Sequence, residues 1–220
     1  MIRPFGESAL LVETGTAERA QALAAGLRDD PIPGVSASVP GLGNLLVELD
    51  PLEDDVEAVK DALERRLDGP APVASPGRLR TIPVVYGGEM GPDLPDVAAL
   101  TGLSEADVVA RHAATELPVL LDGFAPGFAY LGKLPTELRV PRLDTPRTRT
   151  PAGSVAIAGA MSGIYPAALP GGWRVIGRTP VVLFDPQRDP PAYLLPGDRV
   201  RFEPIDAAAW DERAGAPDDW

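Results

Sequence analysis

The sequence contains no cysteine and only one histidine, His112, among its 220 residues. Without cysteine the chain has no disulfide, no thiolate metal site and no thiol nucleophile. A single histidine excludes a multi-histidine metal site within one chain, so we expect no bound metal. A Ser-His-Asp triad would have to use His112, and no Gly-x-Ser-x-Gly motif is present. Neither a Gly-x-x-x-x-Gly-Lys-Ser/Thr loop nor a Gly-x-Gly-x-x-Gly motif occurs, so any use of a nucleotide would need another mode of binding or another subunit.

Basic residues are also scarce. Lys and Arg number 20 against 32 Asp and Glu, which gives a net charge of −12. Such a surface repels phosphates, so we expect no nucleic-acid partner and no anionic membrane partner, although a local basic cluster could still bind an anion. No apolar run approaches the roughly 20 residues that span a bilayer. The first residues lack the basic-then-apolar pattern of a secretion signal, and we expect a soluble, cytoplasmic protein.

Hydrophobic residues make up 45% of the chain, which is enough for a buried core, and the length suits one large domain or two small ones. The first part alternates strand and helix patterns. Strands are expected at 8–13, 35–39, 45–49 and 80–86, with helices at 16–27 and 54–67 and a Pro- and Gly-rich loop at 68–77. This β-α-β-β-α-β order predicts a ferredoxin-like α/β sandwich over residues 1–86.

The pattern changes in residues 87–220. One helix is expected at 96–115, with Ser104 and Asp107 as a weak capping box. Short apolar runs between Gly and Pro residues then predict strands at 155–158, 174–176, 181–184 and 199–202. Many short strands between turns favour a β-barrel or a sandwich, so the whole chain is expected to be α+β. The acidic tail from residue 206 is expected to be loosely docked.

Several motifs set this second part apart. They are Gly-Phe-Ala-Pro-Gly-Phe-Ala-Tyr-Leu-Gly (123–132), Pro-Arg at 141–142 and 146–147, Pro-Ala-Gly-Ser-Val-Ala-Ile-Ala-Gly (151–159), Gly-Ile-Tyr-Pro (163–166) and Pro-Gly-Gly-Trp-Arg-Val-Ile-Gly-Arg-Thr-Pro (170–180). With Leu-Pro-Gly-Asp-Arg-Val-Arg-Phe (195–202), this combination closely resembles the family of the 5-oxoprolinase B-type subunit, also called allophanate hydrolase subunit 1. The resemblance covers nearly the whole chain and implies an α+β N-terminal domain followed by a cyclophilin-like β-barrel.

The resemblance implies one member of a complex rather than a self-sufficient enzyme. Such a protein acts with a homologous C-type barrel subunit and an A-type subunit to open 5-oxoproline to glutamate at the expense of ATP. ATP, with Mg²⁺, would be bound in the complex, and no cofactor would be covalently attached. Related barrel pairs belong to urea- and allophanate-processing or carboxylating systems, and one family member instead inhibits a histidine kinase. A peptidyl-prolyl isomerase is a further alternative that rests on fold analogy alone.

The sequence departs from the family pattern at the Gly-Ile-Tyr-Pro motif. The usual Gly-Gln-Thr that precedes it is Ala160-Met161-Ser162 here, and Met161 removes the hydrogen-bonding amide of the glutamine. Asp122 replaces a usual leucine before the Gly-Phe motif, and residues 117–119 replace a usual Tyr-x-Val. These differences bear on the identity of the substrate more than on the fold.

Polar candidates for the site come from the same motifs. Arg147 and Arg178 present planar forks suited to a carboxylate or phosphate, with internal pairing to acidic residues as the alternative. His112 is a candidate general base, and a capping or buried hydrogen-bonding role is the alternative. Ser154 has no evident base beside it, which disfavours a nucleophile and leaves hydrogen bonding to a ligand or to the barrel.

Aromatic residues and glycines complete the predicted site. Tyr130, Tyr165 and Trp173 could line a pocket and donate hydrogen bonds, with Tyr165 placed beside His112 in the chemistry. They equally suit a barrel core or an interface with a partner protein. Four glycines are expected either to make tight turns or to line an anion pocket with their N–H groups. These are Gly127, Gly153, Gly163 and Gly172.

Overall fold

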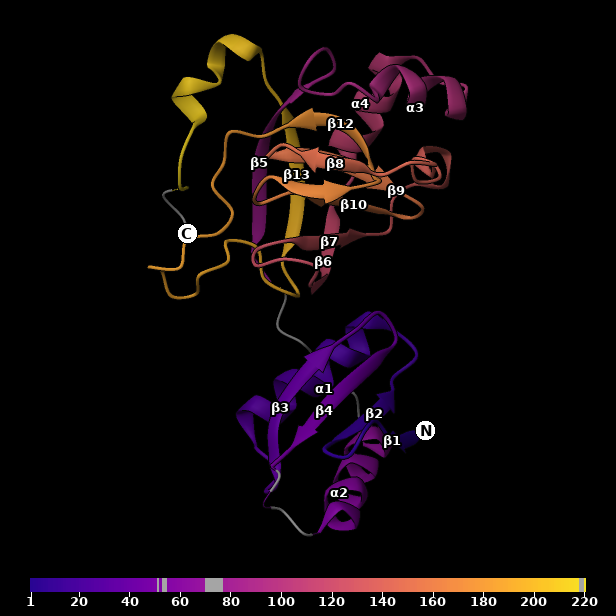
Figure 1. The fold of residues 1–220 in the computed structure, drawn as a ribbon, viewed down its shortest axis with the longest axis vertical. Helices are drawn as coiled ribbons and strands as arrows, with labels where there is room; N and C mark the ends of the chain where they lie inside the picture. The colour runs from indigo at the N-terminus through magenta and orange to yellow at the C-terminus, as the bar shows by residue number, and fades with distance from the viewer. Residues whose placement is uncertain (51, 53–54, 70–76, 218–219) are drawn as a thin grey trace. The chain divides into compact units, whose positions relative to one another are not determined.

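The computed structural model describes residues 1–220 except 51, 53–54, 70–76 and 218–219 (Figure 1). The chain forms two compact units, Met1–Pro76 and Gly77–Trp220. The predicted boundary after residue 86 was wrong, because the strand Leu79–Tyr86 belongs to the second unit. Most of the loop predicted at 68–77 lies outside the described residues.

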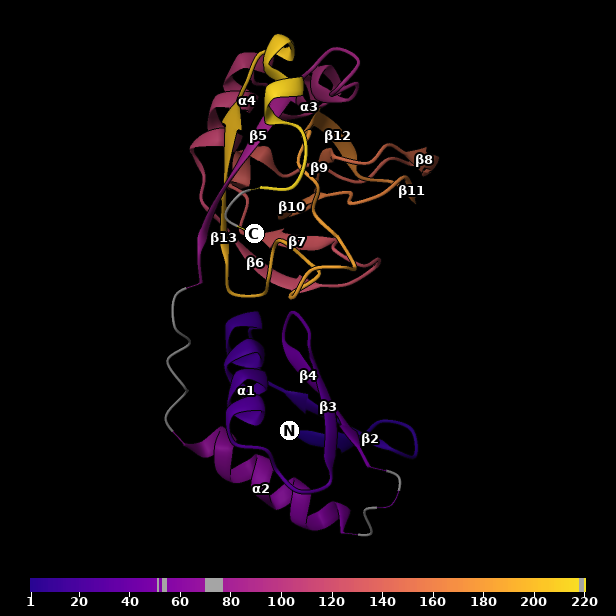
Figure 2. The same cartoon turned by 90° about the vertical axis from the view of Figure 1, so that its left-hand side faces the viewer.

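The first unit is an antiparallel sheet covered by two helices (Figure 2). Apolar residues alternate along its central strands, so that Leu10 and Val12 of one and Leu45 and Val47 of the next are buried on the same face. The helices add apolar residues at helical spacing to this one core. The elements are β1 (Ile2–Pro4), β2 (Ala9–Glu13), α1 (Ala17–Asp29), β3 (Val35–Pro40), β4 (Asn44–Leu49) and α2 (Val56–Asp68).

The order of this sheet is β1-β2-β4-β3, which corrects the predicted topology in one respect. Three strands and two helices follow the ferredoxin-like path. The edge position that the last strand of that fold would occupy is filled by β1, which pairs antiparallel with β2. The predicted last strand could not fill it, because residues 79–86 pair with two strands of the other unit. Thr16 caps α1 as expected, and its side chain accepts a hydrogen bond from the N–H of Arg19.

In the second unit the described strands close into a barrel in the order β10-β7-β6-β13-β5-β12-β9. The α+β fold with a C-terminal β-barrel is therefore confirmed. β5 and β13 run parallel and the other pairs are antiparallel. The strands are β5 (Leu79–Tyr86), β6 (Leu117–Asp122), β7 (Ala129–Gly132), β9 (Ser154–Ala158), β10 (Met161–Ile164), β12 (Arg174–Arg178) and β13 (Arg199–Pro204). A separate pair, β8 (Arg147–Thr150) and β11 (Leu169–Gly171), lies outside the barrel.

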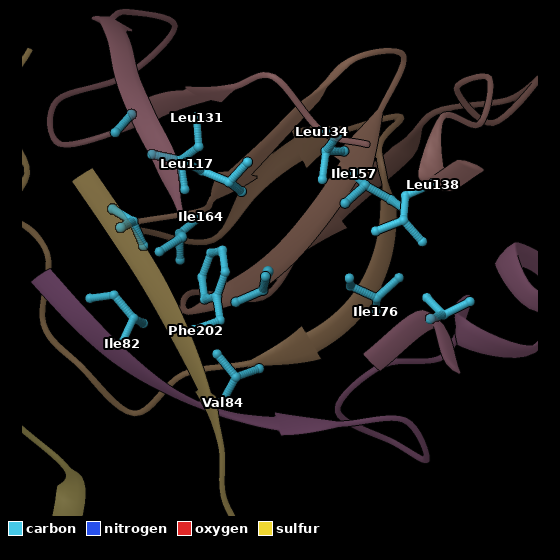
Figure 3. Close-up of a cluster of buried hydrophobic side chains, with 14 of the residues drawn as sticks. Ile82, Val84, Leu117, Leu131, Leu134, Leu138, Ile157, Ile164, Ile176 and Phe202 are labelled. Atoms are coloured by element: carbon cyan, nitrogen blue, oxygen red, sulfur yellow. The ribbon is translucent and has the colours of Figure 1, made fainter. Parts of the chain in front are cut away.

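Aliphatic side chains from every barrel strand and one phenylalanine fill the interior (Figure 3). Ile82, Leu131, Ile157 and Ile176 come from four different strands, and Phe202 of β13 lies among them. Because one face of each strand is inside a closed barrel, the side chains that function can use must come from the outer face, the strand ends or the loops.

Helix α3 (Leu94–Thr101) packs beside β12 and α4 (Glu105–Ala114) packs beside β13. The single helix predicted at 96–115 is therefore two. Gly102 ends α3 in a left-handed conformation with φ of 70°, and Ser104 starts α4 by accepting a hydrogen bond from the N–H of Asp107.

The strand predicted at 181–184 was also wrong. This segment makes only isolated bridges, Val181 with Gly215 and Phe184 with Ala192. The tail forms short 3₁₀ turns at Ala207–Ala209 and Asp211–Arg213, and a further turn, Thr136–Leu138, follows β7. Trp220 donates its indole N–H to the carbonyl of Pro190, so the tail is tied to the barrel unit at this point.

Candidate functional site

A second apolar cluster lies on the outside of the barrel. β9 is buried on both faces: Val155 and Ile157 join the interior core, whereas Ala156 and Ala158 join this outer cluster. Three aromatic rings, those of Phe128, Tyr165 and Trp173, complete it together with Val175. Small alanines on the strand thus leave room for large rings on the barrel surface.

A pocket of about 100 Å³ opens at this outer cluster. Four of the residues predicted for the site line it, namely Tyr130, Tyr165, Gly172 and Trp173. The other lining residues are Phe124, Phe128, Arg142, Pro170 and Gly171. The fold therefore brings the three predicted aromatic residues together from three different motifs.

Tyr165 is the central polar group of the pocket. Its side chain is only 2% exposed, and it meets the ring of Phe128 edge to face at 5.3 Å between centroids. Burial raises the pKa of the Tyr165 hydroxyl, while a backbone hydrogen bond at Trp173 and the charges of Arg142 and Arg147 oppose that rise. The hydroxyl stays protonated at neutral pH and is a hydrogen-bond donor.

Two glycines give Tyr165 and its neighbours the space they occupy. A Cβ on Gly171 would lie 2.1 Å from the Tyr165 hydroxyl oxygen. A Cβ on Gly163 would lie 3.1 Å from the rings of both Phe128 and Trp173. Glycine at these positions is thus a packing requirement of the pocket.

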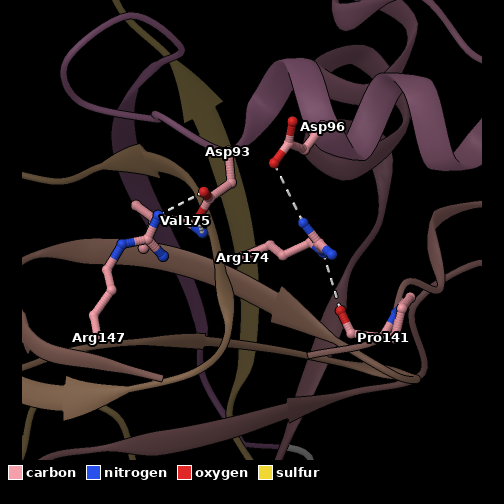
Figure 4. A network of polar contacts seen from close by, with 6 residues as sticks. All are labelled: Asp93, Asp96, Pro141, Arg147, Arg174 and Val175. Atoms are coloured by element: carbon pink, nitrogen blue, oxygen red, sulfur yellow. Dashed lines mark hydrogen bonds and ion pairs between the residues drawn. The ribbon is translucent and has the colours of Figure 1, made fainter. Parts of the chain in front are cut away.

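Arg147 does not line the pocket. Its guanidinium is held by the carboxylate of Asp93 (Figure 4). Its Nη2 donates to Oδ1 of Asp93 at 2.6 Å, and Oδ2 of Asp93 accepts from the N–H of Val175 at 2.6 Å. Nη1 of Arg147 is buried without a hydrogen-bond partner. The alternative of internal pairing with an acidic residue is therefore present for this arginine. The positive charge of Arg147 also acts to lower the pKa of the Tyr165 hydroxyl.

Arg174 supports the same region (Figure 4). Its Nε donates to the carbonyl of Pro141 at 3.1 Å, and Nη1 lies 3.5 Å from a carboxylate oxygen of Asp96. These contacts join β12 to α3 and to the loop that contains Pro141 and Arg142. Arg174 thus ties the backbone next to Arg142 to β12.

Arg178 and Ser154 are paired with each other across β12 and β9, away from the pocket lining. Arg178 donates from Nε to the carbonyl of Ala152 at 2.7 Å, and its guanidinium lies over the ring of Trp210 at 5.4 Å. Ser154 is buried and its carbonyl accepts from the N–H of Tyr165 at 2.9 Å. These contacts are structural, and the structure does not bring the two side chains to the predicted site.

His112 is completely buried and does not line the pocket. Its Nδ1 lies 2.8 Å from the Tyr86 hydroxyl and its Nε2 lies 3.0 Å from Oγ of Ser162, which donates to the carbonyl of Ala156 at 3.2 Å. A neutral imidazole with its proton on Nε2 satisfies every one of these contacts. Burial lowers the pKa of His112 to about 3, so the ring stays neutral. The geometry supports the buried hydrogen-bonding alternative and not a general base.

The remaining predicted glycines serve turns and close packing. Gly127 and Gly153 have φ of 78° and 79°. A Cβ would lie 2.6 Å from the Cβ of Phe184 at the first and 2.2 Å from the carbonyl oxygen of Thr179 at the second. Among the described residues, no three His, Asp or Glu side chains form a set that could hold a metal ion. No described helix is long and apolar enough to cross a membrane.

Sequence patterns did not single out Phe124 and Phe128, and they favoured Arg147 and Arg178 over Arg142. Phe124 carries a signal that only the structure makes visible: it is 59% exposed and has φ of 70°, a conformation that a phenylalanine rarely adopts. Both phenylalanines belong to the Gly-Phe-Ala-Pro-Gly-Phe motif, and the repeat of aromatic residues around glycine and proline was the available clue.

Comparison with known proteins matches these features to a family. The model of the family described as "Carboxyltransferase domain, subdomain C and D" matches residues 1–194. The protein named as the B subunit of 5-oxoprolinase in Escherichia coli O157:H7 is 44% identical over 91% of this chain and 94% of its own length. The protein of the same name from Bacillus subtilis is 39% identical over 91% of each chain.

Solved structures agree with this assignment. The crystal structure of TTHA0988 is 38% identical with a TM-score of 0.80 over 94% of this chain, which spans 41% of that longer chain. The conserved uncharacterized protein PH0987 from Pyrococcus horikoshii is 40% identical over 96% of this chain and 100% of its own, with a TM-score of 0.59. The Kluyveromyces lactis urea amidolyase, at 20% identity and a TM-score of 0.75, shares the fold. The chain therefore belongs to the family of carboxyltransferase domains, subdomains C and D, together with the proteins named as B subunits of 5-oxoprolinase.

Proposed function

We propose that this chain is a non-autonomous subunit of an ATP-dependent 5-oxoprolinase, which opens 5-oxo-L-proline to L-glutamate as ATP is converted to ADP and phosphate. It acts with a homologous C-type barrel subunit and an A-type subunit. The observation that carries this proposal is the 44% identity, over 91% of the chain and 94% of the relative, to a protein named as the B subunit of 5-oxoprolinase. A match of this extent means that nearly all of the relative has a counterpart in this chain.

The geometry of the outer pocket supports a small organic substrate. Aromatic rings surround a volume of about 100 Å³, and a protonated tyrosine hydroxyl and a guanidinium border it. A concave site with mostly apolar walls and a few polar groups is typical of a small-molecule site. The protein as a whole is acidic, with a net charge of −12, so the positive charge of Arg142 provides local attraction for an anionic substrate.

We assign ATP and its Mg²⁺ to the assembled complex rather than to this pocket. A volume of about 100 Å³ is far below the roughly 300–1,000 Å³ of pockets that hold drug-sized ligands, and ATP is at least that large. His112 and Ser154 are left out of the proposed chemistry because both are buried in contacts of their own. Tyr165 is the predicted catalytic residue that keeps access to the pocket.

The test is ATP-dependent release of glutamate from 5-oxo-L-proline by this chain mixed with its A-type and C-type partners, with each protein omitted in turn. Loss of activity on omission of this chain supports the proposal. Full activity without this chain contradicts it. Assembly of all three without activity would also contradict it as stated.

A substitution at Met161 tests, in the same experiment, whether this position selects the substrate. Its side chain packs partly buried against the outer cluster, where the family usually carries glutamine. An assembled complex that is inactive with 5-oxo-L-proline, and that gains activity with Met161→Gln, would show that the chain serves a different amide. Equal activity of both forms would show that position 161 does not select the substrate.

A further inference from the structure

The outer pocket offers three different kinds of recognition within one small volume. Phe128, Tyr130 and Trp173 present flat apolar surfaces, with each pair of rings inclined at 62–87° and 5.0–5.9 Å apart between centroids. Tyr165 presents a hydroxyl and Arg142 presents a guanidinium. A ligand that uses all of them must combine apolar ring atoms with both an anionic group and an acceptor oxygen.

Arg142 is the group suited to the anion. The Cζ atom of Arg142 lies 6.0 Å from the centre of the Trp173 ring, which places its charge at the edge of the pocket. Within the part of the chain that the structure describes, Arg142 forms no ion pair. This separates it from Arg147, whose Nη2 is taken by Asp93, and from Arg178, whose Nε is taken by Ala152.

Tyr165 is the group suited to the acceptor oxygen. Tyr165 lines the pocket, and a protonated phenol has one O–H to donate. The positive charges of Arg142 and Arg147 act on the same hydroxyl and strengthen it as a donor. A carbonyl oxygen of a bound ligand would accept this proton in a hydrogen bond.

The size of the pocket limits the ligand. An apolar cavity of about 150 Å³ accepts benzene, so a site of about 100 Å³ with one open side suits a five-membered ring. Phe124 stands at the open side, with its ring 5.4 Å from that of Phe128 and 6.5 Å from that of Tyr165. Phe124 is exposed and has a left-handed backbone conformation, so an apolar ring borders the opening through which a ligand would enter.

We propose that this pocket, in this chain rather than in one of its partners, binds the five-membered cyclic amide of 5-oxo-L-proline, with the carboxylate on Arg142 and the amide oxygen on the Tyr165 hydroxyl. The inference rests on the proposed function, and it assigns the site of one substrate. Arg142 is a binding residue and Tyr165 is a catalytic residue that touches the amide to be opened. The assignment of the carboxylate to Arg142 replaces the prediction from the sequence, which favoured Arg147 and Arg178 for the anion.

The experiment uses the assembled complex with Arg142→Gln, Tyr165→Phe or Arg149→Gln in this chain. Arg149 is an exposed arginine on β8 outside the pocket and is the matched control. We measure kcat and KM for 5-oxo-L-proline, and inhibition by 2-pyrrolidinone, which keeps the ring and its amide but lacks the carboxylate. Binding of radiolabelled 5-oxo-L-proline to the same complexes without ATP is measured by equilibrium dialysis.

Arg142→Gln should weaken binding of 5-oxo-L-proline by about 10- to 100-fold, because a hydrogen bond to a charged group is lost. Its inhibition by 2-pyrrolidinone should stay within about twofold of the wild type, a pattern that general damage to the pocket would not produce. Tyr165→Phe should weaken binding of both ligands, because both carry the amide oxygen. It should also lower kcat for 5-oxo-L-proline. Arg149→Gln should change none of these values.

Two results would overturn the inference. One is unchanged binding of 5-oxo-L-proline in Arg142→Gln and Tyr165→Phe, in a complex whose activity still depends on this chain. That result places the substrate elsewhere and leaves the proposed function intact. The other is equal weakening of 5-oxo-L-proline and 2-pyrrolidinone by Arg142→Gln, which would give this arginine no role toward the carboxylate. Activity that does not need this chain would instead remove the proposed function itself.

Discussion

Asp93 holds Arg147 by a single carboxylate oxygen, with 2.6 Å between Oδ1 and Nη2 (Figure 4). The other oxygen of the same carboxylate accepts from the backbone of Val175, so one buried acid ties β8 to β12 at the start of α3. This pair fixes the guanidinium beside the pocket without placing it inside. The arrangement explains why an arginine in a recognised motif contributes charge to the site and no direct contact.

Removal of the Asp93 carboxylate should destabilise the barrel unit. Asp93→Ala leaves the Arg147 charge and the Val175 N–H without a partner, and we expect a loss of about 2–3 kcal/mol in the free energy of unfolding. Urea denaturation checks this value. Asp96→Asn is the control, because Asp96 is exposed and its ion pair with Arg174 should be worth less than about 0.5 kcal/mol. Equal effects of the two substitutions would contradict the structural role of Asp93.

The single histidine predicts how stability depends on pH. The pKa of His112 is lowered to about 3 by burial, against about 6.5 in an unfolded chain. Below pH 6.5 the unfolded state therefore binds a proton that the folded state does not, and stability falls as the pH falls. Between pH 7 and pH 5 the loss should be about 2 kcal/mol.

Urea denaturation at both pH values, compared between the wild type and His112→Gln, measures this contribution. Asp122 titrates in the same range with the opposite sign, because burial and the nearby Asp198 raise its pKa to about 6. Its contribution is common to both proteins and cancels in the comparison. An equal pH dependence of the two proteins would show that the pKa of His112 is the same in the folded and unfolded states, as for a histidine exposed to solvent.

Gly153 and Gly159 should respond differently to alanine. Both have positive φ, but a Cβ on Gly153 would lie 2.2 Å from a backbone oxygen, whereas a Cβ on Gly159 meets nothing within 4 Å. Gly159→Ala should cost about 1–2 kcal/mol from its left-handed backbone alone. Gly153→Ala should cost at least about 2 kcal/mol more, because the chain must also move. Thermal unfolding of the two variants gives the comparison, and equal costs would contradict the close approach.

Phe124→Asn should separate stability from function. Asparagine tolerates the left-handed conformation better than phenylalanine, so we expect a gain of about 1 kcal/mol in stability. The same substitution removes the ring at the mouth of the pocket and should raise KM for 5-oxo-L-proline several-fold in the assembled complex. Denaturation and steady-state kinetics on the same preparation test both effects. Unchanged KM would mean that the strained phenylalanine does not serve the substrate.

Local patterns were sufficient for much of the fold. Alternation along residues 9–13 and 45–49 identified strands, and Thr16 and Ser104 marked helix starts, because these signals depend on neighbours within a few residues. The family motifs between residues 123 and 180 identified the relatives of the chain, because a combination of short motifs is specific even where each one is weak. Charge and composition likewise needed no structure.

Pairing between distant segments could not be obtained in the same way. The strand at 79–86 was recognised as a strand, but only its long-range partners, β12 and β13, show that it belongs to the barrel and that β1 completes the other sheet. The choice among the arginines has the same cause. Arg142, Arg147 and Arg178 all lie in similar Gly- and Pro-rich sequence, and the partner that each finds across the fold leaves only Arg142 at the pocket. Residue types limit which chemistry a chain can perform, whereas the contacts made by residues far apart in sequence select the side chains that remain available for it.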